Sequence, residues 1–198
     1  MKALLRFFGL ARFDPAAEAL YRAAVEEGRR ALYYTDWPEK ALVPDTVDGR
    51  FDMISLMAAL INRRIGLVDR KHTKRAQALA QDLFDVMFAD MDTNLRELGV
   101  SDEGMKHKIK PMASAHLGRV KAYTDCLYAE EAACLQCLVD AFDRNIYRAV
   151  ENADPQPLAQ RAIILAAQLA AVSDDDVLSG RFTFSDPDPA TTSPQAGN

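Results

Sequence analysis

Apolar residues recur at intervals of three and four along most of this chain, and the strict alternation that marks half-buried β-strands is nearly absent. Six stretches carry the helical pattern, and each is long enough for several turns. The expected helices cover residues of about 14–34, 51–68, 76–98, 102–127, 130–151 and 157–172. The pattern predicts an all-α fold, a single compact domain of about six main helices.

The ends of several helices are marked by residues with special backbone preferences. Asp14 precedes a proline, a pair typical of an N-cap and first helical position, and Gly99 stands where a left-handed residue can end a helix. Pro111 falls inside an apolar series, so we expect a kink or break near residues 109–110. Two prolines and a glycine over residues 35–50 predict a loop.

The chain of 198 residues is suited to one domain, and 49% of its residues are hydrophobic, enough for a continuous core. We divide it into a short basic amphipathic segment at residues 1–13, a helical domain at residues 14–173 and a tail at residues 174–198. The tail holds five Asp, one Arg and three prolines, a composition typical of a flexible, disordered segment.

Charged residues are segregated along the chain, although the net charge is only −5. Residues 63–75 carry a net charge of +5, residues 82–103 carry −6 and residues 104–121 carry +5. These blocks are either solvated helix faces that pair with neighbouring helices or a dipolar surface that steers a charged partner. The negative total argues against DNA or another nucleic acid as the main partner.

The steering interpretation predicts the behaviour of the first basic block. If Arg63, Arg64, Arg70 and Lys71 steer a partner or a membrane, reversing their charge slows association and leaves the fold intact.

The cysteine and histidine residues of the predicted helices form no recognisable catalytic, metal or cofactor site. Cys134 and Cys137 lie on an apolar seam inside a helix, and with Cys126 they make an odd number, so we expect all three to stay reduced and to pack in the core. His116 also lies on an apolar seam and is expected in the core or at its boundary. No Gly-rich phosphate loop or nucleophile turn is present, which predicts a protein that is not an enzyme.

Two carboxylates in one helix invite comparison with a metal-binding motif. Asp90 and Asp92 are two residues apart, so their side chains point about 200° from one another and do not easily share one cation. Asp92 and Arg96 are four residues apart and can form a surface ion pair. The sequence therefore predicts no metal here.

The first residues form a basic, amphipathic stretch with no acid. On a helix Lys2 and Arg6 share one side, while Leu4, Phe7 and Phe8 lie on the other. This segment is either a short interfacial anchor for anionic lipid or a piece that packs on the core through its two phenylalanines. Arg6 interrupts the apolar stretch, and no cleavage pattern follows, so we predict a cytoplasmic protein, peripheral on the cytoplasmic face of the inner membrane.

Two longer stretches go beyond generic helical patterns. Residues 43–53 (Val-Pro-Asp-Thr-Val-Asp-Gly-Arg-Phe-Asp-Met) form a distinctive entry to a helix, and residues 84–100 form a distinctive helix end. With the Gly-Arg pair at 118–119 and the Ala-Tyr pair at 122–123, they resemble the ubiquinol-cytochrome c chaperone family. The similarity runs from about residue 17 to 150, and the chain looks like a bacterial member.

The resemblance implies an all-helical assembly factor that binds newly made cytochrome b for complex III at the membrane, without a cofactor. Mitochondrial members also act with a small partner subunit and at the ribosome. The motifs and the first basic block supply the candidate partner-binding residues. These are Asp45, Thr46, Gly49, Arg50, Phe51, Asp52, Arg63, Arg64, Asp90, Asp92, Arg96, Arg119 and Tyr123.

The motif residues have two possible roles. They either contact the client directly or lock the loop to the core through charged hydrogen bonds. Asp48 is expected to cap the helix that opens near residues 49–51, where Gly49 permits the turn. Two other functions stay open: an RNA- or ribosome-binding protein that uses the basic blocks, and a helical enzyme that acts on a lipid-like substrate. Steep salt dependence would favour the first, and a deep pocket with buried polar groups the second.

Overall fold

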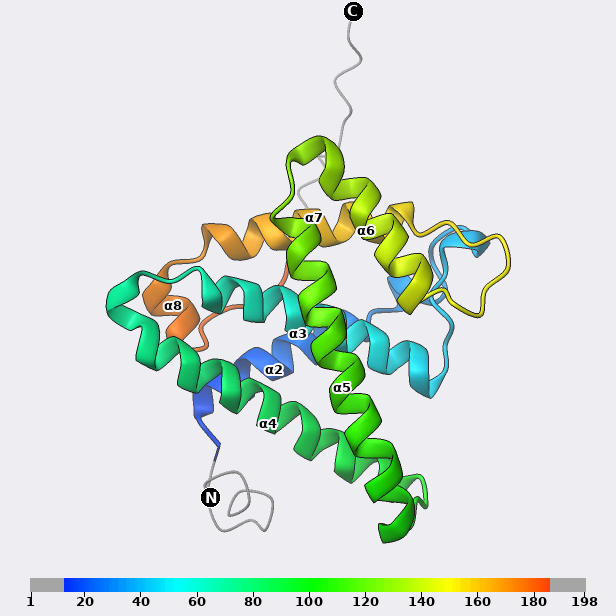
Figure 1. The fold of residues 1–198 in the computed structure, drawn as a ribbon, viewed down its shortest axis with the longest axis horizontal. Coiled ribbons are helices and arrows are strands. Elements are labelled where there is room, and N and C mark those ends of the chain that lie inside the picture. The colour runs from blue at the N-terminus through cyan, green and yellow to red at the C-terminus, as the bar shows by residue number, and fades with distance from the viewer. Residues whose placement is uncertain (1–12, 186–198) are drawn as a thin grey trace, which may run out of the picture.

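The middle of the molecule is occupied by helix α3 (Val47–Gly66), and the other helices pack around it (Figure 1). Its residues 51–61 are all buried, so protein encloses this helix on every side. The helices that contact it are α2 (Pro15–Gly28), α4 (Thr73–Glu97), α5 (Asp102–Leu127), α7 (Gln156–Ala171) and α8 (Asp174–Leu178). Helix α6 (Glu131–Asn145) packs against α5 and α7.

The structure is a computed structural model, and it describes residues 13–185. Within this range the chain forms seven α-helices and no strand, and none of the helices is long and apolar enough to cross a bilayer. The prediction of an all-α domain with six main helices is confirmed, and α8 is an additional short helix. The short 3-10 helices are η1 (Ala31–Tyr33), η2 (Glu39–Ala41) and η3 (Arg70–His72).

Helix α2 begins where the sequence predicts and ends earlier. The Asp14 carboxylate accepts a hydrogen bond of 2.9 Å from the backbone N–H of Ala16, as an N-cap does. The helix stops at Gly28 rather than near residue 34. A Cβ atom at Gly28 would lie 3.3 Å from the backbone nitrogen of Ile54, so glycine lets α2 pack closely on α3.

Helix α3 begins about one turn before the expected position, because Thr46 caps it and Asp48 does not. The hydroxyl of Thr46 accepts a hydrogen bond of 3.0 Å from the N–H of Gly49. Gly49 lies inside the first turn, and a Cβ atom there would be 2.0 Å from the carbonyl oxygen of Pro44. Glycine is thus required by the close approach of the preceding loop and not by a turn.

Helix α5 is one continuous helix, so the break expected at Pro111 does not occur. Pro111 lies on the exposed side, where the lost backbone hydrogen bond is open to water. The predicted stop of α4 is confirmed, since Gly99 has φ of +83°. Ser101 caps α5 by accepting from the N–H of Gly104.

The folded part of the chain extends beyond Asp174, where we placed the start of the tail. Residues 174–178 form α8, and Val177 and Leu178 are buried in the core. A Cβ atom at Gly180 would lie 2.7 Å from Ala16, so the chain after α8 passes close to α2. Residues 1–12 and 186–198, which hold most of the basic segment and half of the tail, lie outside the described residues.

The cysteines differ from the prediction. Cys126 in the last turn of α5 and Cys137 in α6 form a disulfide, with Cα atoms 5.4 Å apart. Cys134 is free and buried, and burial raises the pKa of its thiol. The expectation that all three stay reduced is wrong in this structure, because helical spacing shows which cysteines share a face but not which residue of another helix lies opposite.

Candidate functional site

A buried carboxylate, Asp52, holds three parts of the chain together at the beginning of α3. Only 1% of its surface is exposed. Its Oδ1 lies 2.6 Å from Nη2 of Arg119 in α5, and its Oδ2 accepts a hydrogen bond of 2.5 Å from Nη1 of Arg148, just after α6. Burial raises the pKa of Asp52, and the two guanidinium groups oppose that shift. Arg148 also pairs with Asp48, at 3.4 Å.

Other residues of the motifs lie near Asp52 and Arg119 and are also buried. The Arg119 guanidinium lies 5.6 Å from the centre of the Phe51 ring, within reach of a cation–π interaction. The ring of Tyr123 packs edge-on against Phe142, and burial raises the pKa of its hydroxyl. Phe51, Asp52, Arg119 and Tyr123 thus lie below the surface, and their geometry supports a structural lock rather than direct contact with a partner.

The exposed part of the same motif is the loop that enters α3. Arg50 donates two hydrogen bonds to Asp45, from Nε at 2.6 Å and Nη2 at 3.1 Å, and the guanidinium holds the pKa of this carboxyl below its usual range. Arg50 also lies over the ring of Tyr34, 5.7 Å from its centre. Asp45, Thr46 and Arg50 are exposed and accessible to a partner, whereas Gly49 is buried.

The acidic motif in α4 divides between two sides of the helix, as its spacing predicts. Asp90 accepts hydrogen bonds of 2.7 Å from the hydroxyl of Tyr21 in α2 and of 2.9 Å from Nδ2 of Asn94. Asp92 instead pairs with Arg96 at 2.6 Å, which confirms the expected surface pair. No cluster of three His, Cys, Asp or Glu residues that could hold a metal ion occurs in the described range.

Half of the cations in the first basic block, residues 63–75, make contacts within the fold. Arg64 is buried and donates to the carbonyl oxygens of Leu169 and Val172 at the end of α7. It also pairs with Asp174 at 2.7 Å. The guanidinium of Arg63 donates to the carbonyl of Leu127 and stacks on the ring of Tyr128. Such contacts satisfy carbonyls that a helix end leaves unpaired. For Arg63 and Arg64 these contacts favour pairing with neighbouring helices over the alternative of a free steering surface.

Among the remaining cations of this block, one makes contacts within the fold and three are exposed. Arg75 pairs with Asp14 and donates to the carbonyl oxygen of Leu178, so it links α4 to α2 and α8. Arg70, Lys71 and Lys74 are exposed. A steering surface at this corner is thus limited to these three residues.

A second buried ion pair has no counterpart among the predicted site residues. Glu27 in α2 lies 2.7 Å from Nη2 of Arg161 in α7, and the hydroxyl of Tyr33 donates to the same carboxylate. Glu27 and Arg161 each interrupt an otherwise apolar helix face, and this is the signal in the sequence that indicates the pair. The network ties α2 to α7 across the core.

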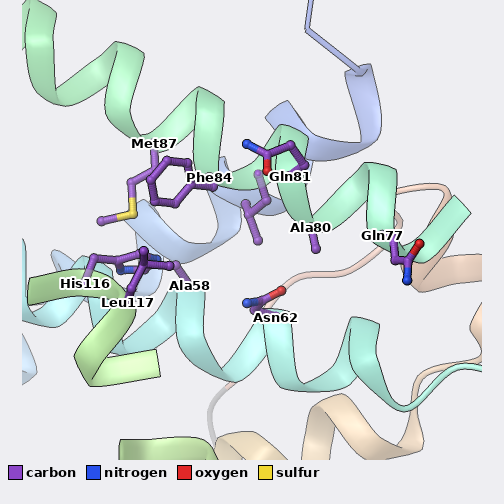
Figure 2. Close-up of a pocket in the computed structure, with 10 residues that line it drawn as sticks. Ala58, Asn62, Gln77, Ala80, Gln81, Phe84, Met87, His116 and Leu117 are labelled. Atoms are coloured by element: carbon purple, nitrogen blue, oxygen red, sulfur yellow. The ribbon is translucent and has the colours of Figure 1, made fainter. Parts of the chain in front are cut away.

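An open groove lies on the surface between α3, α4 and α5 (Figure 2). Its main hollow has a volume of about 420 Å³, and a second hollow of about 260 Å³ continues it along α3 and α4. The main hollow is lined by Ala58, Asn62, Gln77, Ala80, Gln81, Leu83, Phe84, Met87, His116 and Leu117. The continuation adds Ile65, Gly66, Val68, Thr73 and Ala76.

The groove is uncharged at neutral pH. None of the described residues that line it is Asp, Glu, Lys or Arg. His116 lies at its floor, with Nδ1 3.3 Å from the hydroxyl of Ser55, and burial lowers the pKa of its imidazole to about 4. At the rim, Leu117 is 57% exposed, a large apolar side chain left in water. The groove can therefore hold an apolar surface without burying an unpaired charge.

The described residues thus form an all-helical body with an open, uncharged groove that can receive an apolar partner. A family described as ubiquinol-cytochrome C chaperone matches residues 39–184, and the chain belongs to this family. The chain is also similar to the Cbp3 homolog from Brucella abortus, a solved crystal structure. The two are 30% identical, the match covers 86% of this chain and 89% of that chain, and the TM-score is 0.70. A comparison with curated proteins gave no match.

Proposed function

We propose that this chain is an assembly chaperone of ubiquinol-cytochrome c reductase, complex III, and that it binds newly made cytochrome b. Membership of the ubiquinol-cytochrome C chaperone family and similarity to the Brucella Cbp3 homolog support this role. The observation that carries the mode of binding is the uncharged groove between α3, α4 and α5. The bound element is an apolar helix of the client.

The chemistry of the groove suits such a helix. Small side chains at Ala58 and Ala80 let another backbone approach closely, as in packing between apolar helices. Leu117 at the rim and the partly exposed Phe84 supply apolar area, and full burial of one exposed large apolar side chain contributes about 1.5–3 kcal/mol.

The chaperone acts by binding rather than by catalysis in this proposal. Its place is the cytoplasmic face of the inner membrane, where the client is inserted. The basic segment with Lys2, Leu4, Arg6, Phe7 and Phe8 gives a weak membrane contact there. Ribosome or RNA binding is less well supported, since Arg63, Arg64 and Arg75 are engaged within the fold.

Site-specific photo-crosslinking tests the client and the groove together. A photoreactive amino acid at position 81 or 117 in the full chain should form adducts with cytochrome b in membranes that are synthesising it. The matched control carries the same amino acid at Ala170, which is exposed on α7, away from the groove. Cytochrome b adducts from position 170 without adducts from positions 81 and 117 would exclude the groove, and adducts from no position would contradict the client.

A further inference from the structure

A second groove lies on the other side of α4, between α2 and α4, and has a volume of about 440 Å³. Helix α2 contributes Glu18, Tyr21, Arg22 and Val25, and α4 contributes Val86, Ala89, Asp90 and Thr93. Each set follows the spacing i, i+3, i+4, i+7, so each helix presents one ridge of side chains over about two turns. Two such ridges form the trough into which a third helix packs.

The groove has an apolar floor and carboxylates on both sides. Val25, Val86 and Ala89 are partly or fully buried apolar residues. Glu18 on α2 is exposed, and Asp90 on α4 is fixed in place by its hydrogen bond from Tyr21. The lining therefore holds two acids and the single base Arg22. Such a groove favours a segment with apolar residues on one side and cations on the other.

Residues 1–12 of this chain have that composition. They contain three cations, Lys2, Arg6 and Arg12, and no acid, together with five large apolar residues. The apolar residues are Leu4, Leu5, Phe7, Phe8 and Leu10. As a helix the segment would be about 18 Å long, and each groove ridge spans about 10 Å, so the segment can cover the trough.

The position at which residues 1–12 join the described fold also favours this groove. Phe13, the residue that follows it, lines one end of the groove. A tether this short holds the segment at an effective concentration on the order of millimolar, so even a weak contact is populated. We propose that residues 1–12 dock in the groove between α2 and α4 whenever the protein is away from a membrane.

Docking and membrane binding exclude one another, because both use Leu4, Phe7 and Phe8. In water the groove covers these side chains and limits their exposure. At an anionic bilayer the same residues enter the interface, and the cations face the headgroups. The groove between α2 and α4 is then uncovered only at the membrane. This inference needs no client, and it rests on the membrane contact proposed above for the same segment.

The test uses the full chain with a photoreactive amino acid in place of Phe8. In dilute solution without lipid, irradiation should join position 8 to residues 18–25 or 86–93 of the same molecule, as mapped by mass spectrometry. The substitution Ala89→Trp fills the groove and should abolish this adduct. The matched control Ser114→Trp, at an exposed position on α5, should leave it unchanged. Circular dichroism verifies that both variants are folded.

Charge and lipid give two further readouts. Glu18→Gln with Asp90→Asn removes the carboxylates but keeps an acceptor for Tyr21, and should lower the adduct yield. Vesicles of phosphatidylcholine with phosphatidylglycerol should remove the adduct, whereas phosphatidylcholine alone should not. Adducts between two copies, adducts at Leu117 and its neighbours, or an unchanged yield in Ala89→Trp would overturn the docking site. An adduct that persists on anionic vesicles would overturn the exclusion.

Discussion

The carboxylate of Asp52 and the guanidinium of Arg119 lie 2.6 Å apart in the interior, one on α3 and the other on α5. Together with Arg148 they form a cluster of two cations and one anion. Because a buried charge is costly unless it is paired, Asp52 and Arg119 depend on each other, whereas Arg148 is partly exposed and also pairs with Asp48. The exposed pair of Asp45 and Arg50, in the same motif, has no such dependence.

We predict that Asp52→Ala lowers the free energy of unfolding by about 3 kcal/mol, because it leaves Arg119 buried without its partner. Asp45→Ala, which breaks the exposed pair, should cost less than about 1 kcal/mol. Urea denaturation of the two variants measures both values. Equal effects would mean that the buried cluster contributes no more than a surface pair.

Arg64→Ala should also destabilise the protein, by about 2–3 kcal/mol, since it leaves buried carbonyls of α7 unpaired and releases Asp174. Lys71→Ala should stay within about 0.5 kcal/mol of the parent, because Lys71 is exposed. Thermal unfolding provides the comparison. A stable Arg64→Ala variant in which α8 remains protected from hydrogen exchange would contradict the role of this guanidinium.

The stability of the protein should fall on mild acidification because of His116. Its pKa is lowered from 6.5 to about 4, mainly by burial, so below pH 6.5 the unfolded chain binds a proton that the folded chain excludes. The full stability is present above pH 6.5, and about 3 kcal/mol is lost as the pH falls to 4.

The substitution His116→Gln isolates this effect. Free energies of unfolding measured between pH 7 and pH 4 should fall less in this variant than in the parent. His107→Gln, at an exposed position on α5, should leave the parent profile unchanged. Identical slopes for all three proteins would rule out His116 as the titrating group.

Leu117→Asn should weaken client binding without affecting stability. Leu117 is 57% exposed at the rim of the groove between α3, α4 and α5, so little packing is lost in the free protein. The control Leu98→Asn changes a leucine that is 64% exposed at the end of α4. Recovery of cytochrome b by pull-down should drop for the first variant only, and a drop for both would indicate a general effect of surface apolarity.

The helices and several of their ends could be predicted from local pattern. Apolar spacing locates all six long helices, and Asp14, Gly99 and Ser101 mark three ends, because capping depends on residues within a few positions. The same reasoning fails at Pro111, since one exposed proline does not overcome the packing of a long helix. It also fails at Asp48, because a neighbouring hydroxyl, that of Thr46, provides the cap.

The candidate site was less accessible to sequence reasoning, since it depends on which helices meet. Arg63 and Arg64 look like members of a basic surface until the ends of α5 and α7 are placed beside them. Phe84 belongs to an apolar series that indicates core, yet it is only partly buried and lines an open groove. Periodicity identifies the face that avoids water, but not whether a helix of the same chain covers that face.

The enclosure of residues 51–61 of α3 has a consequence for the synthesis of the protein. Its last neighbours, α7 and α8, begin 90 and 108 residues after it ends, so this apolar helix leaves the ribosome without part of its cover. Contacts so distant in sequence form late in folding, and until then the exposed helix is prone to aggregate. During its own translation the chain is therefore in the same condition as the clients it is proposed to protect.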